Sequence, residues 1–275
     1  MQTILVGDIH LKSRIMLPMV EKAVNEHGAK QIILMGDYLD DYDCEHNPQL
    51  YLDELNYLIG WKKKMESADI KVIPLLGNHD APYLTGELKN YSLHENFYML
   101  PNNQDISEVI SQKLIELGIQ ISFQLDDFLV SHAGYIRGSK PKRWHHRKLT
   151  LDEKDIRWVS EIASQEGSRG GLGPTGSVIW ADFSDLIKLP SIDVTNQIVA
   201  HTPQSKIIFE YEREVHYQLV DIDTFSLKPI EEYPYVEYIG NGELLLYNNG
   251  ELSAIGTDWR NKDILENLYQ QRQQD

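Results

Sequence analysis

Aspartate, histidine and asparagine side chains recur in this sequence directly after short apolar segments. The set comprises Asp8, His10, Asp37, Asp40, Asn78, His79, His132 and His201. Carboxylate, imidazole and amide oxygen groups are ligands for divalent ions such as Mn²⁺, Fe²⁺, Co²⁺ or Zn²⁺. The thiolates of a structural zinc site are missing, because Cys44 is the single cysteine. The pattern therefore predicts a catalytic metal site.

The set holds more potential ligands than one ion with an open coordination position needs. A carboxylate such as Asp37 can bridge two ions about 3.5–4 Å apart, the geometry used for in-line phosphoryl displacement. Such a pair binds a phosphate oxygen, lowers the pKa of a bridging water and neutralises charge on phosphorus. A neighbouring imidazole, His79, is then available to protonate the leaving oxygen.

Each of these residues also has an ordinary structural explanation. Gly-Asp and Gly-Asn pairs are common in turns, and a single Asp-x-His motif arises often by chance. A solitary histidine after a strand is more often a core or surface residue than a metal ligand. The joint occurrence of all the motifs, each after a predicted strand, favours the metal site.

The elements that position these residues follow from the spacing of apolar segments. Short runs rich in branched residues cover residues 3–6, 31–35 and 71–76, and helix-compatible segments cover residues 13–27 and 48–68. This β-α-β-α-β order predicts an α/β fold with parallel strands. Because α/β folds bind ligands at the carboxyl ends of their strands, the motifs after these runs are expected to converge.

The remainder of the chain alternates helices and strands in the same way. We expect helices over residues 106–117 and 151–165, and strands over residues 119–124, 128–131, 197–200, 206–209 and 216–221. His132 and His201 each follow one of these strands. The Asn241-Gly242 and Asn249-Gly250 turn signals predict hairpins around residues 244–247 and 252–255, before a terminal helix. We expect a catalytic domain over residues 1–229 and a hairpin and helix extension over residues 230–275, packed on the same domain.

Composition and charge exclude several classes of protein. A chain of 275 residues with 41% hydrophobic and 25% charged residues is neither disordered nor collagen-like. The net charge of -16 disfavours general nucleic-acid or anionic-membrane binding. A single cysteine and the lack of a signal-peptide pattern predict a cytoplasmic protein, and no stretch reaches the roughly 18 apolar residues of a membrane span. No obligate protein partner is evident.

Five motifs resemble the successive signatures of the calcineurin-like metallophosphoesterase superfamily. They are Gly7-Asp8-Ile9-His10, Gly36-Asp37-Tyr38-Leu39-Asp40, Gly77-Asn78-His79-Asp80, Ser131-His132-Ala133-Gly134 and Ala200-His201-Thr202-Pro203. The His-Ala-Gly and His-Thr-Pro segments of the last two motifs, together with residues 178–182, are similar to the serine/threonine phosphoprotein phosphatase branch. That branch includes phage phosphatases and symmetrical dinucleoside tetraphosphatases. Residues 221–224 are similar to the Ile-Asp-Thr strand of bacterial members, so the resemblance covers about residues 1–224.

The resemblance implies a fold and a role for each residue of the set. The fold is a two-sheet β-sandwich flanked by helices, with two metal ions at the edge formed by the strand ends. The implied ligands are Asp8, His10 and the bridging Asp37 for the first ion, and Asp37, Asn78, His132 and His201 for the second. His79 is implied to be the general acid, oriented by Asp40. We expect Mn²⁺, with Fe, Zn, Co or Ni as alternatives.

One position departs from the family pattern. Phosphoprotein phosphatases follow Gly-Asp-x-x-Asp with an arginine that grips the phosphate, whereas this chain has Asp41. No arginine between residues 180 and 201 replaces the second family arginine. Loss of an arginine fork weakens phosphate binding and opens the site to diesters or nucleotides.

A basic loop over residues 140–148 offers substitutes for the missing arginine. The candidate substrate-binding residues are Arg137, Arg143 and Arg147, and Trp144 is a candidate platform for a base. The alternative is a solvated charge run between two elements of structure.

These features together predict a two-metal phosphohydrolase. The main hypothesis is a phosphomonoesterase of the serine/threonine protein phosphatase type, which uses metal-bound hydroxide on a phosphorylated protein or a small phosphorylated molecule. A dinucleoside polyphosphate hydrolase or a phosphodiesterase is the alternative enzyme. A non-catalytic binding module is disfavoured, because every expected ligand and the pair of His79 and Asp40 are present.

Overall fold

The computed structural model describes residues 1–94, 104–169, 173–213, 217–230 and 236–273. Its first five-stranded sheet has the order β12-β11-β1-β2-β3. The strands are β1 (Gln2–Val6), β2 (Gln31–Leu34), β3 (Lys71–Pro74), β11 (Leu244–Asn248) and β12 (Glu251–Ile255). β1, β2 and β3 are parallel, as the alternation of strands and helices predicts, whereas β11 is antiparallel to β1.

Two long helices connect the parallel strands of this sheet. α1 (Ser13–His27) ends at Gly28, whose left-handed backbone is the usual helix stop. α2 (Pro48–Ser67) begins after Asn47, whose side-chain oxygen accepts a hydrogen bond from the backbone N–H of Leu50. Proline at the first position of α2 leaves no further N–H unsatisfied there.

The second five-stranded sheet has the order β4-β5-β6-β8-β7. Its strands are β4 (Ser122–Leu125), β5 (Phe128–Ser131), β6 (Asn196–Val199), β7 (Ile208–Glu212) and β8 (Tyr217–Asp221). β5, β6 and β8 are parallel to one another, and β4 and β7 pair antiparallel at the two edges. The remaining helices before the carboxyl-terminal hairpin are α3 (Ala81–Thr85), α4 (Ile106–Leu117), α5 (Glu153–Ala163) and α6 (Phe183–Lys188), with short 3₁₀ turns η2 (Arg143–His146) and η3 (Gly167–Arg169).

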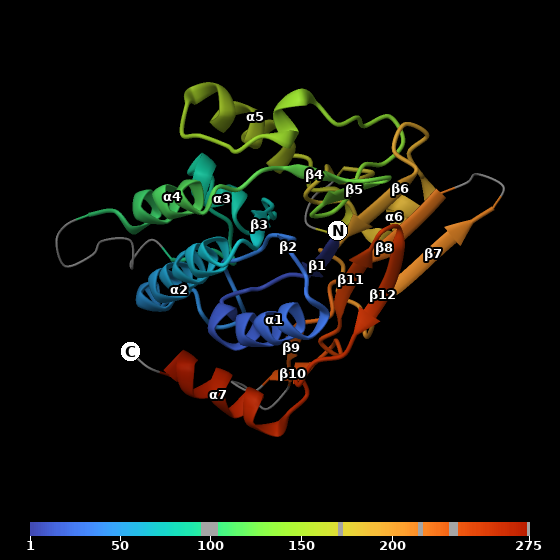
Figure 1. Cartoon of the computed structure of the whole chain (residues 1–275). Helices are drawn as coiled ribbons and strands as arrows, with labels where there is room; N and C mark the ends of the chain where they lie inside the picture. The colour runs from blue at the N-terminus through green and yellow to red at the C-terminus, as the bar shows by residue number, and fades with distance from the viewer. Residues whose placement is uncertain (95–103, 170–172, 214–216, 231–235, 274–275) are drawn as a thin grey trace.

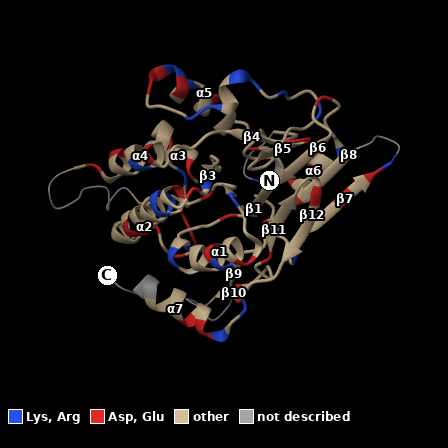
Figure 2. Ribbon diagram, in the orientation of Figure 1, with Lys and Arg blue, Asp and Glu red and all other residues tan. Residues whose placement is uncertain are grey.

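The buried apolar residues of the described ranges form three clusters, which lie between four layers of helices and sheets. Leu5, Ile33 and Val130 belong to a cluster that fills the space between the two sheets. Ile4 and Val6 face the opposite side of β1 and pack in the large cluster beneath the helices, because successive strand residues alternate between faces. Figure 1 shows α1, α2 and α4 on the outer side of the first sheet, and Figure 2 shows that their charged residues are interspersed while most strand residues are uncharged. The expected two-sheet sandwich flanked by helices is confirmed.

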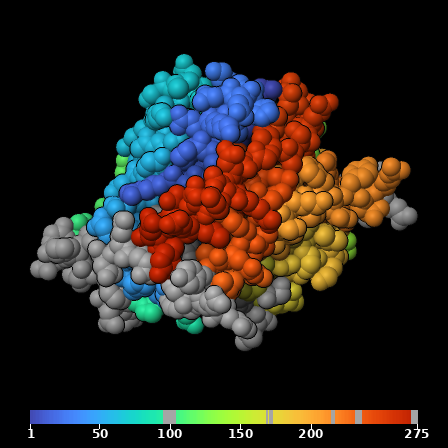
Figure 3. Space-filling model, turned by 90° about the horizontal axis from the view of Figure 1, so that it is seen from below, coloured from blue at the N-terminus to red at the C-terminus, as the bar shows by residue number. Residues whose placement is uncertain are grey.

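The carboxyl-terminal residues pack against the two sheets and their helices. The hairpin of β11 and β12 extends the first sheet, and Trp259 is fully buried against Phe225 and Tyr238. β9 (Leu227–Pro229) and β10 (Val236–Tyr238) form a separate two-stranded sheet, and α7 (Lys262–Gln273) follows. Lys22 of α1 pairs with Asp258 at 3.0 Å, and Figure 3 shows the carboxyl-terminal residues lying against the amino-terminal ones.

Several short elements were not expected from the sequence. α3, α6, β9 and β10 each span six residues or fewer, which is too short for a periodic pattern to stand out. None of the helices in the described ranges combines the length and the apolar composition that a bilayer-crossing segment needs.

Candidate metal centre

The first part of the site is the turn after β1, which carries Asp8 and His10. The Nδ1 atom of His10 lies 2.8 Å from the backbone oxygen of Asp40 and donates its proton there, which leaves Nε2 free as a ligand atom. That Nε2 atom lies 3.6 Å from Asp37 and 3.8 Å from Asp8. Burial lowers the pKa of His10 to about 4, so the ring is neutral, as a metal ligand must be.

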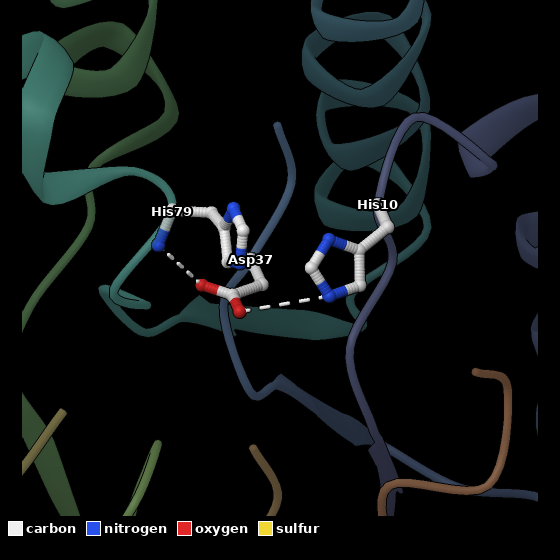
Figure 4. A group of neighbouring side chains, drawn as sticks. All are labelled: His10, Asp37 and His79. Carbon is white, nitrogen blue, oxygen red and sulfur yellow. Dashed lines mark hydrogen bonds and ion pairs between the residues drawn. The ribbon is translucent and has the colours of Figure 1, made fainter. Parts of the chain in front are cut away.

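Asp37, which follows β2, occupies the centre of the site. One carboxylate oxygen accepts the backbone N–H of His79 at 2.8 Å, and the other faces the Nε2 atom of His10 (Figure 4). The same oxygen lies 3.4 Å from Nε2 of His132. Gly77 makes this arrangement possible, because a Cβ atom there would lie 2.0 Å from Oδ1 of Asp37. Asp37 thus has histidines on both sides, as a bridging ligand requires.

The second part of the site comes from β3, β5 and β6. His132, after β5, has its Nδ1 atom 2.9 Å from the backbone oxygen of Met35 and its Nε2 atom 2.9 Å from Oδ1 of Asn78. His201, after β6, packs edge-on to His132 with ring centroids 5.0 Å apart. Burial, followed by the charge of His132, holds the pKa of His201 well below its usual value. Side chains from both sheets therefore meet at one edge.

The donor atoms fit two adjacent divalent ions. Three groups of described residues have all their ligand atoms within 4.8 Å of one another, and two of them share Asp37: His10, Asp37 and His79, and Asp37, His132 and His201. The third group is Asp43, Glu45 and His46. The Nε2 atom of His201 is buried and has no hydrogen-bond partner among the described residues, a cost that a bound ion removes. Burial, then the charges of Asp223 and Asp37, raises the pKa of Asp8 well above its usual value. Cations at this point relieve that repulsion.

The structure therefore brings together all six implied metal ligands. Asp8, which is not a member of either compact group, has one carboxylate oxygen 3.6 Å from Nδ1 of His132. Asn78 reaches the second group through its contact with His132. His79 lies in the first group although the sequence implies another role for it.

The pair of His79 and Asp40 lies beside Asp37. Nδ1 of His79 is 3.1 Å from Oδ2 of Asp40. Burial of the ring would lower its pKa, but the carboxylates of Asp37 and Asp40 outweigh burial and raise the pKa of His79 to about 9. The ring of Tyr91 packs on His79 with centroids 4.4 Å apart. His79 is 23% exposed and bonded to a buried carboxylate, which is the position of a proton donor.

These residues line a cavity of about 710 Å³. Beyond the ligands and the acid pair, its wall holds Lys12, Asp41, Asp43, Glu45, Lys89, Glu166, Arg169, Trp180 and Asp223, among others. Asp41, which stands where related phosphatases have arginine, pairs with Lys12 at 3.2 Å. Lys12 is only 1% exposed and also donates to the backbone oxygen of His10. Lys12 thus balances the negative charge of Asp41, the residue that departs from the family pattern.

Arg169 lines the cavity, although no sequence motif points to it. It lies in η3 and pairs with Asp182 at 3.4 Å. Its guanidinium helps to lower the pKa of His201, after the larger effects of burial and of His132. Arg169 was missed because it precedes Trp180, whereas the second family arginine was expected after it.

The arginines of the basic loop do not line the cavity, and this geometry gives no support for their expected role in substrate binding. Among the described residues that line the cavity, none is Arg137, Arg143 or Arg147. Arg147 instead forms two hydrogen bonds with Asp155, at 2.8 and 2.5 Å. Trp144 is buried and stacks on Trp158 with centroids 4.9 Å apart. These contacts fasten the loop to α5, which explains why its charged residues do not reach the cavity.

Two further aspartates support the site. Asp80 accepts hydrogen bonds from the backbone N–H groups of Tyr38 and Gly77, at 2.9 and 3.0 Å, and so joins the turns after β2 and β3. Asp223 lines the cavity after β8 and accepts from the hydroxyl of Ser226. The similarity of residues 221–224 to a family strand was the available signal for Asp223.

Comparison with known proteins gives a fold and a family. No curated protein sequence matches the chain. Structures of cold-active protein tyrosine phosphatase match it, among them one from a psychrophilic Shewanella species. The Shewanella structure has a TM-score of 0.57, 19% identity and coverage of 94% of this chain and 78% of that one. A second structure of such an enzyme has a TM-score of 0.55, 19% identity and coverage of 95% and 80%.

A yeast protein serine/threonine phosphatase, from Saccharomyces cerevisiae, is more distant, with a TM-score of 0.47, 12% identity and coverage of 93% and 79%. At 19% identity, the likeness to the cold-active tyrosine phosphatases concerns the fold alone. The profile of the calcineurin-like phosphoesterase family matches residues 1–205, the segment that contains every ligand of the site just described. The chain therefore belongs to the calcineurin-like phosphoesterase family.

Proposed function

We propose that the chain is a two-metal phosphomonoesterase of the protein phosphatase type. The observation that carries the proposal is the position of His79, whose ring lies in the same group of ligand atoms as His10 and Asp37. A proton donor next to a bridging carboxylate is what cleavage of a phosphate ester needs at its leaving oxygen. A pure binding module has no use for a histidine held protonated by a buried aspartate.

Each residue has a defined part in this proposal. Asp8, His10 and Asp37 hold one ion, and Asp37, Asn78, His132 and His201 hold the other. When bound, the ions neutralise phosphate charge and lower the pKa of a water molecule. A water oxygen forms a new bond to phosphorus while the P–O bond to the leaving group breaks, and His79 gives its Nε2 proton to the leaving oxygen. The Nδ1–H group of His79 stays hydrogen-bonded to Oδ2 of Asp40. Mn²⁺ is proposed because carboxylate, amide and imidazole donors without thiolates suit it.

Arg169 is proposed as the residue that grips the phosphate. It is the arginine among the described residues of the cavity wall, and its pairing with Asp182 at 3.4 Å is long for a charge-assisted hydrogen bond. The guanidinium is therefore available to a phosphate oxygen. This assignment replaces the basic loop as the source of the missing positive charge.

Cleavage of a diester or of a dinucleoside polyphosphate is the second candidate. The observation that favours it is the Lys12–Asp41 pair, which puts a neutralised pair where related phosphatases grip a phosphomonoester dianion. A diester carries one charge fewer on the phosphate under attack than a monoester, as does each internal phosphate of a dinucleoside polyphosphate. That phosphate therefore needs less positive charge for binding.

Hydrolysis rates for three substrates test the proposal. Metal-stripped protein reconstituted with Mn²⁺ is assayed with phenyl phosphate, diphenyl phosphate and diadenosine tetraphosphate. A dominant rate with phenyl phosphate is expected. A dominant rate with either of the others would replace the proposal by the second candidate, and no hydrolysis of any substrate by metal-loaded protein would favour a binding module.

A further inference from the structure

The carboxylate of Asp40 is held by more than its contact with His79. Asp40 is 1% exposed, and its Oδ1 atom accepts a hydrogen bond from the hydroxyl of Tyr51 at 2.9 Å. The same atom accepts a second hydrogen bond from the hydroxyl of Tyr83 at 2.6 Å. Because Oδ1 is occupied by two donors, Oδ2 is left to accept from Nδ1 of His79.

The direction of the Tyr83 hydroxyl is itself determined. The backbone N–H of Leu93 donates to the oxygen of this hydroxyl at 2.9 Å. The hydroxyl proton must then point toward an acceptor, and Oδ1 of Asp40 is that acceptor. If the Tyr83 hydroxyl stopped donating to Asp40, one of its two buried hydrogen bonds would be lost.

The two tyrosines come from different helices and are buried. Tyr51 lies on α2 and is 0% exposed, and Tyr83 lies on α3 and is 2% exposed. Their rings contact each other with centroids 6.1 Å apart. Ser111 of α4 donates to the backbone oxygen of Tyr83, so three helices fix the positions of the two hydroxyls. Without these hydroxyls, Oδ1 would be a buried oxygen lacking donors, and the carboxylate would turn to satisfy it.

We propose that Tyr51 and Tyr83 are positioning residues that act on the proton donor through Asp40. Their hydroxyls hold the carboxylate so that Oδ2 accepts Nδ1–H of His79, which directs the opposite ring nitrogen, Nε2, to the leaving oxygen. The inference rests on the proposed function, in which His79 protonates that oxygen. Both hydroxyls bind the carboxylate of Asp40, so the tyrosines act on the proton donor through this aspartate.

The test uses two monoesters whose leaving groups differ in their need for a proton. Phenol leaves poorly without one, whereas 4-nitrophenol leaves readily, so the ratio of kcat/KM for phenyl phosphate to that for 4-nitrophenyl phosphate measures the help given by the acid. This ratio is measured for the wild type, Tyr51→Phe, Tyr83→Phe and His79→Asn, all loaded with Mn²⁺. Tyr247→Phe is the matched control, because the hydroxyl of this buried tyrosine of β11 also donates to an aspartate, Asp126, outside the cavity.

We expect His79→Asn to lower the ratio about 100-fold and each tyrosine variant to lower it about tenfold, with metal content unchanged. Tyr247→Phe is expected to keep the wild-type ratio. If His79→Asn lowers the ratio while both tyrosine variants keep it, the positioning role is wrong and the proposed function stands. Loss of metal with an unchanged ratio would also overturn the inference. If His79→Asn keeps the ratio, the acid assignment fails, and the inference fails with it. Either tyrosine variant suffices if the other does not fold.

Discussion

Backbone strain is concentrated at the residues that carry the chemistry. His10, Asp37, Asp40 and His201 have φ values of 44°, 49°, 54° and 68°. A residue with a side chain adopts such a conformation at a cost of about 1–3 kcal/mol, so neighbouring contacts must hold it. For His10 the holding contact is its ring's hydrogen bond to the backbone of Asp40, and for Asp37 it is the N–H of His79. The strain turns each side chain toward one common point.

The raised pKa of His79 leads to a prediction about pH. A group that donates a proton works only while protonated, and with a pKa of about 9 His79 is protonated below that pH and loses its proton above it. Because ions bound at Asp37 offset part of the charge that raises this pKa, we expect kcat for phenyl phosphate to fall as pH rises between the ordinary histidine value of 6.5 and about 9. Rates of the Mn²⁺-loaded enzyme between pH 6 and pH 10, at saturating substrate, measure this.

The control for this pH dependence is His79→Asn. The variant is expected to lose about 100-fold in rate, to keep its metal content and to show no decline in this pH range. A decline that survives the substitution would assign it to another group.

Arg169 gives the second prediction at the scale of single residues. Arg169→Gln is expected to raise KM for phenyl phosphate about tenfold, because a charge-assisted hydrogen bond to phosphate contributes about 1.5–3 kcal/mol. Steady-state kinetics of this variant and of Arg143→Gln distinguish the cavity arginine from the basic loop. An equal rise in KM for both variants would contradict the placement of the phosphate at Arg169.

At the scale of elements, the turns after β2 and β3 cross at van der Waals distance. A Cβ atom on Gly77 would lie 2.0 Å from Oδ1 of Asp37. We predict that Gly77→Ala displaces the bridging carboxylate and lowers the number of bound Mn²⁺ ions per chain below two, as measured by elemental analysis. Gly60→Ala is the control, because nothing lies within 4 Å of its Cβ position in α2. This control should bind metal fully and gain up to about 1 kcal/mol in stability.

Local patterns were sufficient for the elements that carry the site. α1 and α4 have the expected bounds, since each has a clear helical period and ends at a glycine with a left-handed backbone. The three parallel strands β1, β2 and β3 were expected, and the structure brings the polar residues that follow them to one edge. The pairing of β11 with β1 could not be predicted, because no local signal indicates which distant strand a hairpin joins.

The missed features of the site depend on contacts between distant segments. Arg169 reaches the cavity through a 3₁₀ turn whose direction no periodicity describes. The basic loop has the charge of a phosphate site, but buried Trp144 holds it on α5. Charge can be read from a sequence, whereas the face on which a loop lies depends on which of its apolar residues are buried.

At the scale of the whole molecule, buried negative charge is concentrated at the site. Asp8, Asp37, Asp221 and Asp223 are each at most 2% exposed, in a chain with a net charge of -16. Burial and neighbouring carboxylates raise the pKa values of Asp8 and Asp221 well above the usual range. The folded protein without cations is therefore under electrostatic strain that bound ions remove.

Metal removal is consequently predicted to lower thermal stability. An ion at a hundredfold excess over its Kd adds about 2.7 kcal/mol, which corresponds to a rise in Tm of about 5 °C or more. Thermal unfolding of the chelator-treated protein, before and after addition of Mn²⁺, measures the difference. An equal addition of Na⁺ at the same ionic strength controls for general screening. A Tm that responds equally to both cations would argue against specific sites.

The place of β11 beside β1 also has a consequence for the order of events during synthesis. Ile4 pairs with Leu246, almost the whole described chain apart, yet β1 leads directly into the turn of Asp8 and His10. A ribosome makes β1 first, so this strand waits with one edge open while most of the polypeptide is still to be translated. An open edge can pair with the wrong strand, and closing so long a loop is slow. The phosphoesterase site thus gains its finished support late in translation, and nascent chains arrested before β11 are the species most exposed to aggregation.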